Sequence, residues 1–186
     1  MGGEAELQAE VDALRARLTA LEARMHKSHK HGRPPGAELE VLFLSVGALH
    51  AAFELGAVCE VVPAAELAPL PEAPSWVLGT LNLRGATLPV VDIASRLSSR
   101  APGLELSDII VIVSTEHGTA GVVVSEVGAI KNVRLDQRAA FLETPHASYV
   151  VGTFSHDGQA RLLLGVPELL RHSELAPIIG QGQGVA

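Results

Sequence analysis

Two kinds of hydrophobic periodicity divide this chain, and the first covers its N-terminal part. Between residues 4 and 30 the apolar positions alternate in steps of four and three, as do the a and d positions of a heptad repeat. This pattern predicts a helix over residues 1–30, which self-associates as a coiled coil or docks onto another helix. A single amphipathic helix folded against the body is the alternative. The seam residues are Leu7, Val11, Leu14, Leu18, Leu21 and Met25.

The periodicity stops where histidine, glycine and proline become frequent. Residues 31–38 contain His31, Gly32, Pro34, Pro35 and Gly36 and are expected to form a flexible linker. His31 and the two histidines before it match no structural zinc spacing, and no metal site is predicted. A metal-dependent β-barrel protein that uses these histidines stays as a remote alternative. The glycine-rich residues 176–186 are expected to be a frayed tail.

From Leu39 the pattern has period two and favours short strands joined by tight turns. Gly47-Ala48 and the residues around Gly118 are expected to close hairpins, and Asp157-Gly158 is a strong turn signal. Residues 64–74 are rich in proline and are expected to be extended and irregular. Short helical turns are expected over residues 93–97 and after Pro167. The body at residues 39–175 is therefore predicted to be mainly β.

A dense stretch from Trp76 to Asp92 lies at the centre of this body. It is interpreted as a short helix that ends at Gly79, a turn around Arg84, and a strand that ends before Asp92. A single arginine at such a corner can present its guanidinium to a carboxylate or to backbone carbonyls. The structural alternative is a salt bridge from Arg84 to Asp92 or to Glu60.

Composition and charge narrow the class of function. The formal charge of −7 does not suit nucleic acid, because phosphate binding needs a basic face. Apolar residues make up 47% of the chain, yet no run is long enough for a membrane span. The acidic N-terminus does not resemble a secretory signal, and one cysteine suits a reducing compartment. We therefore expect a cytoplasmic protein without direct membrane insertion, in which Cys59 is a small core residue.

No catalytic arrangement emerges from the sequence. Ser155, His156 and Asp157 are neighbours on an expected hairpin tip and cannot form a relay. The glycine-rich segment near the C-terminus follows no strand and opens no helix, so it is no phosphate loop. We expect no enzyme activity and no cofactor. Isolated charges within apolar strands favour a protein-docking surface instead.

The stretch from Trp76 to Gly85, followed by Leu88-Pro89-Val90-Val91-Asp92, resembles the CheW-like family of bacterial chemotaxis coupling proteins. The early hairpin, residues 58–61, residues 122–127 and residues 149–152 support the resemblance, which covers residues 39–171. It implies two five-stranded β-barrels around a shared core and no catalysis. It also implies two protein surfaces, one for the regulatory domain of a CheA-type histidine kinase and one for the helical tip of a chemoreceptor.

The resemblance also suggests which residues bind. Val58 and Glu60 match positions at which the family contacts receptors. The functionally sensitive corner of the family is matched by Asn82, Leu83, Arg84 and Gly85, and the strand after it ends in Asp92. Together these residues form the predicted receptor or kinase-binding set.

The chain departs from the family pattern at three places. Ser125 and Gly165 stand where aspartate is common, and residues 1–36 are an extension. The leading hypothesis is a non-catalytic adaptor that couples chemoreceptors to the kinase. The alternative is an accessory CheW-like protein that binds receptor, or further copies of itself, without engaging the kinase.

Overall fold

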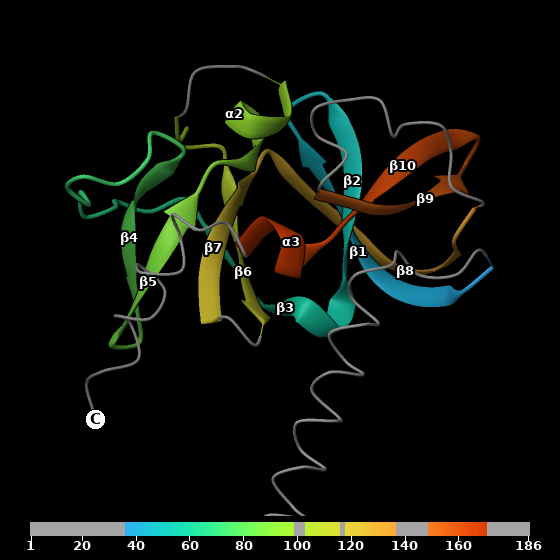
Figure 1. Cartoon of the computed structure of the whole chain (residues 1–186), viewed down its shortest axis with the longest axis horizontal. Helices are drawn as coiled ribbons and strands as arrows, with labels where there is room; N and C mark the ends of the chain where they lie inside the picture. The colour runs from blue at the N-terminus through green and yellow to red at the C-terminus, as the bar shows by residue number, and fades with distance from the viewer. Residues whose placement is uncertain (1–35, 99–102, 116–117, 137–148, 171–186) are drawn as a thin grey trace, which may run out of the picture. The chain divides into compact units, whose positions relative to one another are not determined.

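The computed structural model describes residues 36–98, 103–115, 118–136 and 149–170, and these form two five-stranded sheets (Figure 1). The predicted heptad helix at residues 1–30 and the predicted tail at residues 176–186 lie outside the described residues. Strand β1 begins at Glu38, and the two residues before it already exchange backbone hydrogen bonds with Leu135. Ordered β-structure therefore starts within the expected linker.

Each sheet combines strands from distant parts of the chain. Sheet A has the order β8 (Glu126–Arg134), β1 (Glu38–Val46), β2 (Leu49–Glu54), β10 (Gln159–Leu164) and β9 (Val150–His156). Sheet B has the order β3 (Val58–Pro63), β6 (Ile109–Thr115), β7 (Gly118–Val124), β5 (Ala86–Val91) and β4 (Val77–Leu83). The described helices are η1 (Leu55–Ala57), α2 (Ile93–Ser98) and α3 (Val166–Leu170).

The expected hairpins form where the turn residues predicted them. Strands β1 and β2 pair up to Val46 and Leu49, which leaves Gly47-Ala48 as a two-residue turn. Strands β9 and β10 pair up to His156 and Gln159 around Asp157-Gly158. Both residues of this second turn have positive φ, as the type I′ geometry that suits a hairpin requires. The prediction of a mainly β body is confirmed.

Alternation along the strands fills three apolar clusters. In β1, Leu42 and Leu44 face a core shared by the two sheets, whereas Val41 and Phe43 face the interior of sheet A. Successive residues of β6 likewise point in turn into the shared core and into the interior of sheet B. Residues of α2 and α3 also enter the shared core, and Figure 1 shows α3 between the two sheets. A shared core between two β units is as expected.

The expectation of two five-stranded β-barrels around a shared core is correct in the number of strands and in the core, but neither sheet closes into a barrel. The described strand pairing leaves β3 and β4 as edges of sheet B, and β8 and β9 as edges of sheet A. In sheet B a single β-bridge between Ala68 and Thr80 joins the segment after β3 to β4. In sheet A the N–H of Asp136 donates to the carbonyl of Thr153 at 2.8 Å. Each sheet is curled so that its two edge strands approach each other. We call the line between these edges the seam of the sheet, and isolated contacts rather than a strand ladder cross it.

The prediction of a helix that ends at Gly79 is wrong, because residues 77–83 form strand β4. The pairing register shifts between Val77 and Gly79, so Val77 faces the shared core while Leu78 and Leu81 face the interior of sheet B. Gly79 has a φ of 147°, and a Cβ atom there would lie 2.5 Å from the carbonyl oxygen of Ala68. The glycine permits the close approach of the segment that bridges the seam, and it ends no helix.

Candidate functional site

The corner predicted around Arg84 is a tight β-hairpin turn. Leu83 pairs with Ala86, so Arg84 and Gly85 form a two-residue loop between β4 and β5. Their φ values are 52° and 88°, which fits a type I′ turn. The side-chain oxygen of Asn82 accepts a hydrogen bond from the N–H of Gly85 at 3.0 Å. The turn is therefore fixed locally by the residues that the sequence singled out.

Arg84 and Glu60 form an ion pair that spans the seam of sheet B. One guanidinium nitrogen of Arg84 lies 2.8 Å from a carboxylate oxygen of Glu60. Glu60 belongs to β3 and Arg84 follows β4, and these strands are the two edges of the sheet. The side chain of Glu60 is 29% exposed and that of Arg84 is 79% exposed. The pair therefore joins the two edges and leaves most of the guanidinium in solvent.

The other side chains of β3 alternate between a half-buried face and an exposed face. Val58 and Val62 are half-buried, and Val58 packs against the shared core. Val61 is 42% exposed, and Cys59 is exposed as well. The expectation that Cys59 is a core residue is therefore wrong, because it lies on the outer face of an edge strand. Sequence reasoning did not select Val61, although alternation in residues 58–63 placed it on the same face as Cys59.

Asp92 lies apart from this site. Strand β5 separates it from the Arg84 turn, a span of about 20 Å at the rise of an extended strand. Its carboxylate is buried and accepts hydrogen bonds from the N–H groups of Ala94, Ser95 and Gly103. Asp92 thus caps α2 and anchors the segment that follows it. The ion pair expected for Arg84 forms with Glu60, and a binding role for Asp92 stays a prediction.

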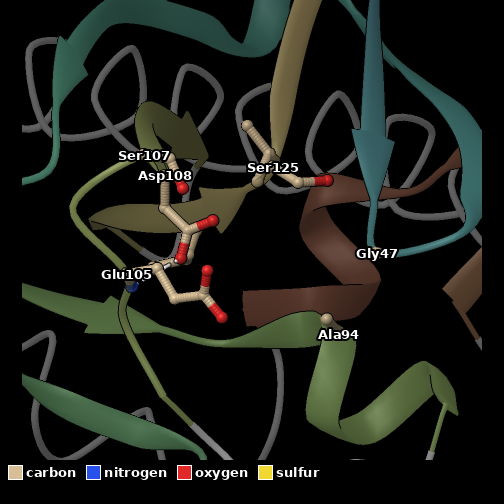
Figure 2. A pocket seen from close by; sticks show the side chains of 8 residues that line it. Gly47, Ala94, Glu105, Ser107, Asp108 and Ser125 are labelled. Atoms are coloured by element: carbon tan, nitrogen blue, oxygen red, sulfur yellow. Dashed lines mark hydrogen bonds between the residues drawn. The ribbon is translucent and has the colours of Figure 1, made fainter.

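A cavity of about 220 Å³ opens where the β1–β2 turn meets sheet B. Figure 2 shows the carboxylates of Glu105 and Asp108 beside it, with Ala94 and Gly47 on its other sides. The carboxylate of Asp108 accepts a hydrogen bond from the N–H of Glu105 at 2.8 Å. Asp108 therefore stabilises the loop that carries both acids, and this acidic rim borders the junction of the two sheets.

The described residues contain no relay at the Ser-His-Asp sequence. The hydroxyl of Ser155 donates to Asp136 at 3.0 Å, whereas the ring of His156 lies edge-on to Phe43. Within the described ranges no three His, Cys, Asp or Glu side chains are grouped to hold a metal ion. The three histidines between residues 26 and 31 lie outside those ranges, so the metal alternative stays untested.

Comparison with known proteins identifies the fold. A family model described as the CheW-like domain matches residues 40–174. The chain is 33% identical to chemotaxis protein CheW of Rhizobium meliloti (strain 1021) over 59% of this chain and 69% of that protein. It is 22% identical to chemotaxis protein CheW of Treponema pallidum (strain Nichols) over 78% and 92% of the respective lengths.

A solved structure agrees with these sequence matches. The crystal structure of the scaffolding protein TtCheW from Thermoanaerobacter tengcongensis superposes with a TM-score of 0.61 and 22% identity, covering 70% of this chain and 90% of that one. None of the described helices is long and apolar enough to cross a membrane. CheW-like proteins are scaffolds of chemotaxis systems and not enzymes. The extent of the family match shows that this chain belongs to the CheW-like family of chemotaxis scaffold proteins.

Proposed function

We propose that this protein couples chemoreceptors to a CheA-type histidine kinase in the cytoplasm. The observation that carries the proposal is the Glu60–Arg84 pair, because it holds the predicted corner residues beside the exposed edge strand β3. Family membership supplies the expectation of both partners, and the named relatives are chemotaxis proteins.

The receptor surface is proposed to be the outer face of β3 together with the Arg84 turn. Val61 offers exposed apolar area there, and Val58 lies half-buried next to the shared core. Glu60 and Arg84 add charge at the rim, with most of the arginine still available to a partner. An amphipathic helix binds through apolar anchors flanked by such charges. The tip of a receptor helical hairpin fits that chemistry.

The second candidate is an accessory protein that binds receptor, or copies of itself, without engaging the kinase. The heptad pattern of residues 1–30 favours it, because a coiled coil would supply contacts that the CheW-like domain alone lacks. Ser125, where the family often has aspartate, also lines the cavity at the junction of the sheets. The two candidates differ in whether the kinase binds.

Calorimetric titration with the regulatory domain of a chemosensory kinase from the same organism separates the two candidates. A coupling protein binds this domain with a micromolar Kd. An accessory protein binds a receptor hairpin fragment in a parallel titration and gives no heat with the kinase domain. Failure of the folded protein to bind either partner, together with the mass of a single copy in light scattering, would contradict both candidates.

A further inference from the structure

An arginine side chain lies on the inner face of sheet A, near the β9–β10 turn. Arg161 of β10 pairs with Phe154 of β9, so the two side chains share one face of the sheet. Phe154 is fully buried in the sheet A interior, and its ring stacks on Phe43 with the centroids 5.7 Å apart. The central guanidinium carbon of Arg161 lies 4.5 Å from the centroid of the Phe43 ring. The guanidinium is thus held by a cation–π contact on an aromatic platform.

The fold leaves one hydrogen-bond donor of Arg161 without a partner among the described residues. Its Nε atom is buried and has no hydrogen-bond partner. Salt bridges in the described part of the chain involve Arg84, Arg134 and His156, and none includes Arg161. Buried polar groups normally find partners, and a half-buried cation normally finds an anion. The buried Nε–H group is out of reach of an external acceptor, so Arg161 offers a partner the charge of its terminal nitrogens, which no ion pair within the described residues neutralises.

Two titratable side chains on the β9–β10 hairpin lie near this platform. His156 contacts the Phe43 ring edge-on, with centroids 4.8 Å apart. A ring nitrogen of His156 lies 3.3 Å from a carboxylate oxygen of Asp157. Asp157 is 88% exposed at the turn, so water screens its charge. The aspartate lowers the local positive potential without ion-pairing with Arg161.

We infer that Arg161, seated on Phe43, is a binding site for one carboxylate, which an aspartate or glutamate side chain of a protein partner supplies. The two terminal nitrogens of the guanidinium present parallel N–H donors that match a carboxylate, whereas the Nε–H group is buried, and the stacked ring fixes the plane of this fork. One such contact is too weak to retain a free carboxylate at cellular concentrations. Within a larger protein interface it selects an acidic residue at one position. This inference does not depend on which partner binds the β3 surface.

The Arg161 Nε–H group is a local reporter of this site, because it belongs to the same guanidinium as the terminal donors. In the ¹⁵N-labelled full-length protein the Nε–H resonance of Arg161 is assigned as the one that disappears in Arg161→Met. A capped pentapeptide with one glutamate between glycines should shift this resonance progressively at high millimolar concentrations, and the same peptide with glutamine should not. The Nε–H of Arg134 is the matched control, because that arginine is already paired with Glu38 at 2.7 Å. Asp157→Asn should tighten peptide binding, and asparagine tolerates the positive φ at that position.

Stability measurements separate a binding role from a structural one. Arg161→Met keeps the length of the side chain and removes an unsatisfied donor, so the melting temperature should stay the same or rise. A marked fall in melting temperature would show that Arg161 serves the fold and would count against the inference. An Arg161 resonance that ignores the glutamate peptide, or that shifts equally with sodium chloride, would overturn it. A response to sodium acetate without a response to the peptide would show that the site takes a small free carboxylate, and would overturn the inference that a partner's side chain supplies it.

Discussion

Exchanging Arg84 for glutamate places two carboxylates where a cation and a carboxylate now lie 2.8 Å apart. An ion pair with so exposed a partner contributes about 0.2–1 kcal/mol, and the new repulsion costs a similar amount. The positive φ of the turn burdens glutamate as much as arginine, so the backbone adds little. The expected loss of stability is about 1–2 kcal/mol, which for a chain of 186 residues lowers the melting temperature by about 3–6 °C.

Partner binding should suffer more than folding. If the exposed guanidinium contacts a partner, Arg84→Glu should weaken binding of receptor hairpin or kinase domain at least tenfold, or about 1.4 kcal/mol. Arg134→Glu is the matched control, because it breaks another exposed ion pair at 2.7 Å and changes the net charge equally. Calorimetric titration of each variant measures the effect, and thermal melting followed by circular dichroism checks the fold.

The charge-swapped double variant Glu60→Arg with Arg84→Glu separates two mechanisms. Swapping the charges restores an ion pair across the seam of sheet B but moves the cation to β3. Recovery of stability without recovery of binding would show that Arg84 touches the partner. Recovery of both would show that the pair acts by holding β3 and β4 in place. An equal loss of binding in Arg84→Glu and Arg134→Glu would refute a specific role, and unfolding of Arg84→Glu would show that the arginine is structural.

Three further predictions concern other parts of the chain. Asp92→Ala removes the carboxylate that accepts from the buried N–H of Ala94 and the half-buried N–H groups of Ser95 and Gly103, and chemical denaturation should show a loss of about 2–4 kcal/mol. Gly79→Ala drives a methyl group toward the carbonyl of Ala68, and the same assay should show a loss of about 1–3 kcal/mol. Deleting residues 1–36 should lower the number of copies per particle measured by light scattering while the β-sheet spectrum persists; an unchanged number of copies would contradict the coiled-coil prediction.

Local sequence signals predicted the strands and most turns because their causes are local. Gly47-Ala48 and Asp157-Gly158 have the backbone freedom that tight hairpins need, and alternation marked the flanking strands. The prediction of a helix after Trp76 fails because a short apolar run has too few residues to distinguish a helix from a strand. A glycine at this place indicates a helix end in the sequence, whereas in the structure Gly79 is required by the close approach of Ala68, which lies 11 residues earlier.

The geometry of the candidate site depends on long-range contacts that a pattern does not reveal. The sequence offered Glu60 and Asp92 as alternative partners of Arg84, and the choice follows from the curl that brings the β3 and β4 edges together. The exposure of Cys59 follows from the position of β3 at a sheet edge. Arg161 was not selected at all, because its contact with Phe43 joins strands more than 100 residues apart.

Simultaneous binding of receptor and kinase tests the coupling proposal most directly. The kinase regulatory domain is titrated calorimetrically into this protein after saturation with a receptor hairpin fragment from the same organism. A coupling protein should bind the kinase domain with a micromolar Kd in the presence of receptor and form a complex of all three components. Absence of kinase binding, or displacement of the receptor fragment by the kinase domain, would contradict the proposal that one copy bridges the two.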